Sequence, residues 1–122
     1  MIKFGTLSAA NITPKALVYP CSDEPRAYIR AIAARDRARA EGFAKWHRIG
    51  HVHDSYDEVM DDASTYAFYN PLPIAMHHEW TIKALRAGKH VICEKSFAAN
   101  AQEAEEMAAV AKETGLVLMD AF

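Results

Sequence analysis

The sequence predicts a doubly wound α/β fold, in which a parallel sheet of about six strands carries helices on both faces. Short apolar segments of strand length alternate along the chain with longer segments whose apolar residues recur at helical spacing. The connections between successive strands are mostly long enough for the crossovers that parallel pairing requires. The 122 residues suit a single domain, which we expect to span residues 1–122.

The composition excludes several classes of protein. With 51% hydrophobic and 25% charged residues, the chain has the make-up of a folded globular protein rather than a disordered one. A net charge of −2 argues against sequence-independent binding to nucleic acid, and no segment reaches the roughly 18 apolar residues of a membrane span. Cys21 and Cys93 are too few for a disulfide scaffold and suit a reducing compartment. We therefore expect a cytoplasmic protein without nucleic-acid or membrane partners.

The first half of the chain carries three expected helices with recognisable starts. Thr13 followed by Pro14 has the pattern of an N-cap and a first helical residue, and Asp36 can cap the next helix. Ser55 with Glu58 has the pattern of a capping box. These signals and the apolar spacing predict strands over 2–7, 28–34 and 51–53, and helices over 14–18, 37–46 and 56–60.

Proline and glycine divide the second half of the chain. Pro71 and Pro73 cannot both lie in a sheet interior, so residues 70–73 are expected to form a loop. Gly88 and Gly115 each end a helix, and Asn100 caps the second one. The pattern predicts strands over 66–69, 90–93 and 116–119, and helices over 75–87 and 101–114. The core-facing residues expected on these two helices are Met76, Trp80, Ala84, Ala104, Met107, Ala108 and Ala111.

A doubly wound sheet binds ligands at the carboxyl ends of its strands, which here are the loops 8–13, 34–39, 70–77 and 94–97. In the first loop, Ser8, Ala10 and Thr13 occupy the glycine places of a dinucleotide fingerprint, so the loop is either a phosphate-binding turn or a plain turn of small residues. In the second loop, Arg35 follows a neutral strand end. It either suits the 2′-phosphate of NADP or belongs to a solvated helix start.

The other two loops carry charged and imidazole groups. Lys95 follows the fifth strand beside Glu94, where it is either a site residue or half of a surface ion pair. His77 and His78 start the helix after the proline loop, and either face a ligand or serve packing. The histidines at 51 and 53 lack an evident third ligand, so no metal site is expected.

Four segments together resemble the Gfo/Idh/MocA oxidoreductases, in particular members such as glucose–fructose oxidoreductase and the dimeric dihydrodiol dehydrogenases. The segments are 33–36 (AARD), 69–73 (YNPLP) with His77, 84–95 (ALRAGKHVICEK) and 119–122 (MDAF). The resemblance covers essentially the whole chain, and the stretch from Ala87 to Lys95 is its most specific part.

The resemblance implies a Rossmann domain that binds NADP or NAD, within an enzyme that moves a hydride between the nicotinamide and a sugar or related hydroxylated substrate. In the family the lysine after the fifth strand takes part in catalysis, which assigns that role to Lys95. Arg35 takes the place that meets a 2′-phosphate in NADP-preferring members. The lysine also lies by the nicotinamide in the family, so Lys95 is an implied cofactor-binding residue as well. The others are Ser8, Ala9, Ala10, Asn11, Ile12, Asn70, Pro71, Leu72, His77 and Glu94.

The sequence departs from the family pattern at three places. Ser8 and Ala10 replace glycines of the fingerprint, Ile74 replaces the usual asparagine of the proline loop, and Ser96 replaces the proline after the lysine. Family members also carry a second domain that supplies much of the substrate pocket. We expect this chain to lack that domain and to be inactive alone, because a lysine without a substrate pocket cannot position a substrate.

The expected absence of the second domain also predicts how the chain associates with copies of itself. Without a covering domain, the apolar side chains of Phe97, Met119 and Phe122 should be exposed, which favours self-association or marginal stability. An alternative to the enzyme interpretation stays open on the sequence alone. The chain can instead be a non-catalytic module that binds a nucleotide or serves a structural role.

Overall fold

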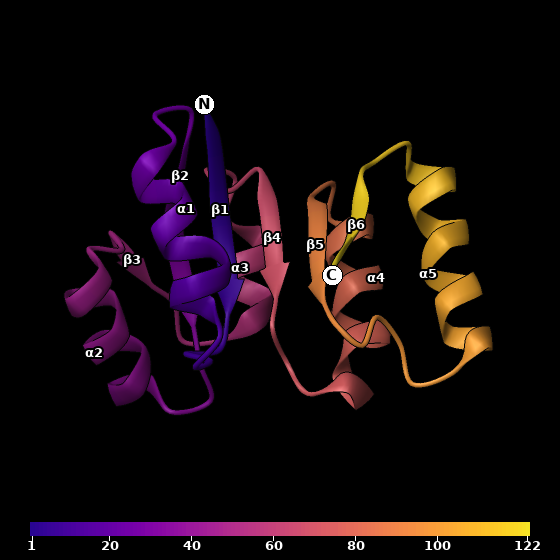
Figure 1. Cartoon of the computed structure of the whole chain (residues 1–122), viewed down its shortest axis with the longest axis horizontal. Coiled ribbons are helices and arrows are strands. Elements are labelled where there is room, and N and C mark those ends of the chain that lie inside the picture. Colours follow the sequence, from indigo (N-terminus) through magenta and orange to yellow (C-terminus); the bar gives the residue numbers. More distant parts are fainter.

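A six-stranded, wholly parallel sheet in the order β3-β2-β1-β4-β5-β6 runs through the molecule (Figure 1). The structure is a computed structural model that describes all residues from Met1 to Phe122. The order reverses between β1 and β4, as in a doubly wound fold, so the predicted fold class is confirmed. The strands are β1 (Ile2–Leu7), β2 (Ala27–Ala33), β3 (His51–Val52), β4 (Ala67–Asn70), β5 (His90–Glu94) and β6 (Leu118–Ala121).

Five α-helices and two short helical turns connect the strands. The α-helices are α1 (Tyr19–Asp23), α2 (Arg37–His47), α3 (Tyr56–Asp61), α4 (His77–Arg86) and α5 (Ala101–Thr114). A π-helical turn, Pro14–Val18, leads into α1, and a 3₁₀ turn, Ile74–Met76, leads into α4. None of these helices has the length and apolarity that crossing a bilayer requires.

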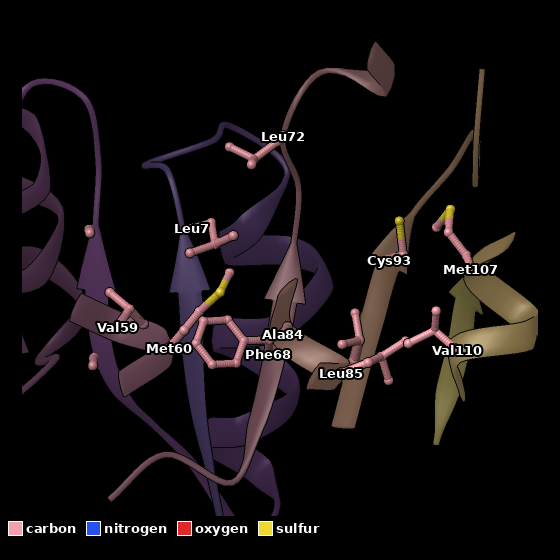
Figure 2. Packing of buried hydrophobic residues seen from close by; sticks show 13 residues of the cluster. Leu7, Val59, Met60, Phe68, Leu72, Ala84, Leu85, Cys93, Met107 and Val110 are labelled. Carbon is pink, nitrogen blue, oxygen red and sulfur yellow. The ribbon is translucent and has the colours of Figure 1, made fainter. Parts of the chain in front are cut away.

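Two apolar clusters fill the two sides of the sheet, because successive residues of a strand point to opposite faces. Phe68 of β4 belongs to the first cluster, together with residues of α3, α4 and α5 such as Val59 and Leu85 (Figure 2). Its neighbour Tyr69 belongs to the second cluster, which contains Ala40 of α2. β4 and the last four residues of β1 are therefore buried on both faces of the sheet.

Three of the four predicted N-caps are confirmed. Asp36 accepts hydrogen bonds from the N–H groups of Ala38 and Arg39, while Ser55 and Asn100 each accept one from the residue three positions later. Thr13 and Pro14 take the predicted N-cap and first helical positions, but Thr13 does not cap the helix with its side chain. The backbone of Thr13 is already helical, because the chain enters this helix through a π-helical turn rather than an extended residue.

Tertiary pairing moves several predicted boundaries by one or two residues. Asn70 lies at the end of β4 rather than in the loop, because it pairs with Cys93 of β5. The sixth strand starts at Leu118 because the N–H of Leu116 still bonds to the carbonyl of Ala111 at the end of α5. The second strand is Ala27–Ala33 rather than 28–34, and α4 starts at His77 after the 3₁₀ turn rather than at residue 75.

The expected core faces of α4 and α5 are largely confirmed. On α4, Ala84 is buried and Trp80 packs against the first cluster, as does Met76 of the 3₁₀ turn before this helix. On α5, Met107 is buried and Ala111 packs against the same cluster. The prediction for Ala108 is wrong, because it is exposed and the buried position is instead Val110.

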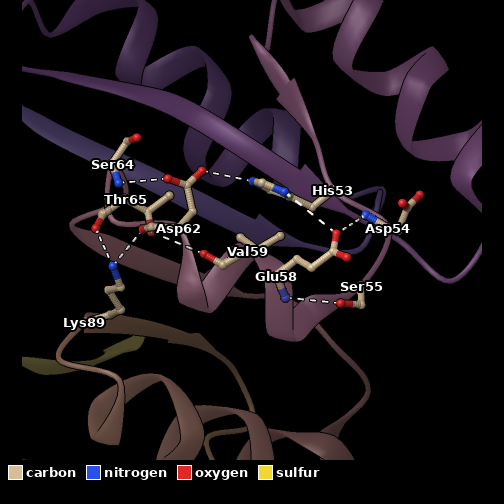
Figure 3. Close-up of polar contacts among 9 residues, drawn as sticks. All are labelled: His53, Asp54, Ser55, Glu58, Val59, Asp62, Ser64, Thr65 and Lys89. Carbon is tan, nitrogen blue, oxygen red and sulfur yellow. Dashed lines mark hydrogen bonds and ion pairs between the residues drawn. The ribbon is translucent and has the colours of Figure 1, made fainter.

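A polar network ties the end of α3 to β3 and to the loop before β4 (Figure 3). The carboxylate of Asp62 lies 2.9 Å from Nε2 of His53 and accepts a hydrogen bond of 2.8 Å from the N–H of Ser64. Lys89 as a residue is 8% exposed. Its ammonium group donates to the carbonyls of Asp62 and Thr65 at 2.8 Å each. These contacts fix the connection on which the register of β4 depends.

One half of one sheet face carries no helix. The π-helical turn and α2 pack on β1 and β2 in the second cluster, whereas the same side of β5 and β6 is open (Figure 1). An apolar hollow of about 250 Å³ lies there, and Met119 and Tyr66 at its border are about half exposed. The lining residues are Ile2, Phe4, Tyr66, Ala67, His90, Val91, Ile92, Val117 and Met119.

Candidate functional site

A hollow of about 230 Å³ opens where β1, β2 and β4 end, at the switch in strand order. It brings together three of the four loops that the sequence singled out. The lining residues are Ser8, Ala9, Ala34, Arg35, Asp36, Arg39, Tyr56, Leu72, Pro73 and Met76. Its position is the one at which open α/β sheets bind their ligands.

The loop after β1 turns sharply at Ser8, which has a left-handed backbone with φ of 69°. The N–H of Ser8 donates to the carbonyl of Ala33 at 2.6 Å, which joins the loop to the end of β2. Ala9 is buried at the wall of the hollow, whereas Asn11 and Ile12 are exposed. The small side chains of Ser8 and Ala9 stand where this loop borders the hollow, which is the pattern of a phosphate-binding turn.

The loop after β2 gives the hollow a positive border. Arg35 is exposed and lines it, and Arg39 crosses to the first loop, where its Nη2 donates to the carbonyl of Ala9 at 3.2 Å. The carboxylate of Asp36 also lies at the border, but it is engaged by the first N–H groups of α2. Sequence reasoning did not single out Arg39 as a site residue. Arg39 is the third residue of α2, in the first helical turn beside the Asp36 cap, and this position was the signal that could have found it.

The loop after β4 is shaped from inside by Asn70. Its amide nitrogen donates to the hydroxyl of Thr81 at 3.1 Å, and its amide oxygen accepts from the N–H of Leu72 at 3.2 Å. Asn70 is 1% exposed, so it supports the loop rather than lining the hollow. Leu72 does line the hollow, and Pro71 beside it is half-buried.

His77 also lies inside the fold. The ring is 0% exposed, Nδ1 lies 2.8 Å from the carbonyl oxygen of Ser96, and Nε2 lies 2.6 Å from that of Leu72. The resemblance implied that His77 lines the cofactor cleft, whereas the structure places it behind two of the loops that form the cleft. It connects the loop after β4 with the loop after β5.

The loop after β5 presents Lys95 to solvent beside Glu94. Glu94 does not form the ion pair considered for it: one carboxylate oxygen accepts from the hydroxyl of Tyr69 at 2.9 Å and the other from the N–H of Lys95 at 3.0 Å. Burial, followed by the hydrogen bond to Glu94, raises the pKa of Tyr69 well above its usual range. The peptide bond between Lys95 and Ser96 is cis.

Cys93 precedes this charged segment and is fully buried. Burial raises the pKa of its thiol to about 11, and its Sγ lies 3.6 Å from the carbonyl oxygens of Glu94 and Phe97. A neutral, buried thiol serves packing rather than chemistry. Lys95 is an exposed cationic group at this strand end, along the same sheet edge as the hollow.

Comparison with known proteins agrees with this architecture. A family model described as "Oxidoreductase family, NAD-binding Rossmann fold" matches residues 6–122. The chain belongs to the Gfo/Idh/MocA family. The resemblance found in the four sequence segments is thereby confirmed, and the chain is an NAD(P)-binding domain of that family of oxidoreductases.

Named relatives of this Gfo/Idh/MocA domain act on several ring compounds. The chain is 36% identical over 121 residues to a dTDP-3,4-didehydro-2,6-dideoxy-alpha-D-glucose 3-reductase of Actinomadura kijaniata, which covers 99% of this chain and 36% of the relative. It is 41% identical over 125 residues to the trans-1,2-dihydrobenzene-1,2-diol dehydrogenase of Sus scrofa, with coverage of 99% and 36%. The chain thus spans about a third of the length of these curated relatives.

Solved structures extend the comparison to the cofactor. The 3-ketoreductase KijD10 of Actinomadura kijaniata, solved with NADP and TDP-benzene, matches with a TM-score of 0.91 and 37% identity over 98% of this chain and 36% of that one. A biliverdin reductase of Synechocystis, solved with biliverdin and NADP+, has a TM-score of 0.89 at 18% identity and shows the fold alone.

Proposed function

We propose that this domain binds NADP(H) in preference to NAD(H), with the 2′-phosphate at Arg35 and Arg39. The observation that carries the proposal is the charge at the border of the hollow. Two guanidinium groups lie there, and the one carboxylate that lines the hollow with them, that of Asp36, is occupied by the start of α2. NAD-specific domains instead place a free acidic group at the end of the second strand, where it binds the ribose 2′-hydroxyl.

The residues present fit a dinucleotide along the carboxyl edge of the sheet. The loop of Ser8 and Ala9 would hold the pyrophosphate, with the N–H of Ala9 as the donor because that of Ser8 is bonded to Ala33, and Leu72 would pack against the adenosine half. The nicotinamide half would extend along the edge towards Lys95, at the end of β5. The cofactor supplies the hydride, and the protein supplies binding, orientation and charge.

We infer that Lys95 donates or accepts the proton at the reacting oxygen of the substrate in the whole enzyme. Its ammonium group lies on an exposed loop, and the neighbouring Glu94 is bonded to other partners, so the lysine is free to meet a substrate. We propose a sugar or related hydroxylated ring as substrate. The named relatives act on a deoxysugar nucleotide and a dihydrodiol, which share a ring carbon that carries oxygen.

Cofactor titration with matched arginine variants tests this function. We expect tighter binding of NADPH than of NADH, and Arg35→Ala should remove about one to two orders of magnitude of that preference, because a charge-assisted hydrogen bond contributes roughly 1.5–3 kcal/mol. Arg37→Ala makes the same change in charge two residues away, where the guanidinium pairs with Glu41 and Asp54. It should leave the preference intact.

Two results would overturn parts of the proposal. Equal affinity of the unmutated chain for NADPH and NADH would contradict the role of Arg35. Binding of neither cofactor, with the fold intact by circular dichroism, would instead favour the non-catalytic structural module. Turnover belongs to a separate assay on the whole enzyme, in which Lys95→Met should abolish hydride transfer while leaving NADPH affinity nearly unchanged.

We also propose a cytoplasmic location and self-association. Cys21 and Cys93 are both free thiols, as suits a reducing compartment. Exposed apolar residues support association, although the predicted set changes: Met119 is 51% exposed and Phe122 fully so, whereas Phe97 packs partly against the core. Cell fractionation tests the location, and the association is argued below with its own experiment.

A further inference from the structure

His77 joins two loops of the site through backbone carbonyl oxygens only. Nε2 lies 2.6 Å from the carbonyl oxygen of Leu72, in the loop that lines the hollow, and Nδ1 lies 2.8 Å from that of Ser96, next to Lys95. The ring is wholly buried, so water cannot substitute for either partner. Each oxygen is an acceptor, and each nitrogen must therefore carry a hydrogen to bond to it.

A neutral imidazole has a single N–H donor. In the neutral ring, one nitrogen would direct its lone pair at a carbonyl oxygen less than 3 Å away, which is repulsive. In the doubly protonated ring both contacts become charge-assisted hydrogen bonds, which are the stronger kind. The start of α4 and the complete burial of the ring both oppose a positive charge, and the two direct hydrogen bonds have to offset both effects.

No carboxylate competes for either ring nitrogen. The loops and helix around His77 do carry titratable groups, and most of these have partners of their own. Cys93 is a neutral thiol, and Lys95 is exposed to solvent. The partnered groups are Glu94 with Tyr69, His78 with Glu106, and Glu79 with Lys83.

We propose that His77 is a positioning residue, whose doubly protonated ring ties the loop of Leu72 to the loop of Lys95 and so fixes the lysine relative to the cofactor hollow. The consequence for Lys95 rests on the function proposed above. The two contacts of His77 with the loops do not depend on that function. Two hydrogen bonds to two separate loops set the distance between them, which a side chain that only filled space would leave free to vary.

The protonation state can be observed directly in the unmutated chain. Long-range ¹H–¹⁵N NMR of the ¹⁵N-labelled protein at neutral pH distinguishes an imidazolium, with two protonated nitrogens, from a neutral ring with one. The signal of His77 is identified by its loss in His77→Gln. We expect two protonated nitrogens, and a single protonated nitrogen would overturn the proposal.

The positioning role is tested with the adjacent histidine as control. In protein with ¹³C-methylated lysines, His77→Phe should shift the signal of Lys95, which is assigned through Lys95→Arg. His78→Phe, on the same helix but bonded to Glu106, should leave that signal in place. NADPH affinity should fall about tenfold in His77→Phe and stay unchanged in His78→Phe.

Each outcome separates this inference from the proposed function. An unmutated chain that binds no NADPH would contradict the function, while the ring and lysine signals would still decide the inference. A folded His77→Phe with an unshifted Lys95 signal would overturn it. If that variant does not fold, His77→Gln serves in its place: its single amide group should retain one tie, so a partial shift of the Lys95 signal is expected and no shift would contradict the proposal.

Discussion

The carboxylate of Asp62 shows how a single residue fixes a turn of this fold. Burial by itself would raise its pKa, but the hydrogen bonds with His53 and Ser64 outweigh that effect and lower it to about 2 (Figure 3). A carboxyl group whose pKa is lower in the folded than in the unfolded chain stabilises the fold while it is ionised. That stabilisation is fully present above the ordinary value near 4. It is lost as the pH falls towards 2.

Replacing this carboxylate should change the acid sensitivity of the fold. At neutral pH, Asp62→Asn should lower the free energy of unfolding by about 1–2 kcal/mol. Near pH 2 the difference in stability between the two proteins should be much smaller, because the carboxylate of the folded, unmutated chain is then about half protonated. Urea unfolding across a pH series measures this convergence. Asp61→Asn changes the preceding, exposed carboxylate and serves as control; parallel curves for Asp62→Asn and the unmutated chain would refute the account.

Individual residues also mark the limit of what the sequence reveals about the site. Arg35 could be placed from the sequence because its position follows directly from the end of the second strand. The burial of His77 and Asn70 could not, because their partners Ser96 and Thr81 lie 19 and 11 residues away and meet them only after the sheet has formed. The resemblance identified these positions as important, but the backbone contacts decide what they do.

At the scale of elements, local signals predicted boundaries well and long-range pairing moved them. The caps at Asp36, Ser55 and Asn100 satisfy N–H groups two or three residues away, so the sequence alone specifies them. The end of β4 depends on Cys93 of β5, which no local pattern around Asn70 encodes. The same reason explains why fold class was predictable while strand ends were not.

The approach of β1 to α3 depends on a glycine and yields a prediction. A Cβ atom on Gly5 would lie 2.8 Å from Cγ1 of Val59 and 3.3 Å from Cζ of Phe68, both fully buried. Gly5→Ala should therefore overpack the core and lower the free energy of unfolding by about 1–3 kcal/mol. Thermal and urea unfolding measure the change.

The same substitution in α2 provides the control with the opposite sign. A Cβ atom on Gly42 would meet nothing within 4 Å, so Gly42→Ala should stabilise the protein by roughly 0.5–1 kcal/mol through helix propensity. Val59→Ala should recover part of the loss in the double variant with Gly5→Ala, because it removes the clashing methyl group. A gain in stability from Gly5→Ala would show that Val59 moves aside at no cost.

At the scale of the whole molecule, the sheet is covered unevenly. Helices pack on both faces of β1, whereas β5 and β6 are open on the face that holds the apolar hollow of about 250 Å³. This hollow and the hollow lined by Arg35 share no residue, so the two surfaces can be altered separately. An apolar patch and an unpaired sheet edge at β6 are both features through which chains associate.

This uneven cover predicts concentration-dependent association of the chain with itself. Light scattering after size-exclusion chromatography, over a concentration series, should show a rising mean mass. Met119→Lys places a charge at the border of the open hollow, where pairing would have to bury it, and should keep the chain monomeric.

Trp46→Lys serves as the control. It removes an apolar side chain that is more exposed than that of Met119, 83% against 51%, but that lies on α2 and away from the open face. The Trp46→Lys variant should associate like the unmutated chain. An equal loss of association in both variants would therefore indicate non-specific hydrophobic association rather than pairing through the open sheet face. A strictly monomeric unmutated chain at every concentration would show that the open sheet face is stable in water, and the cofactor titrations proposed for Arg35 would then describe a single domain acting alone.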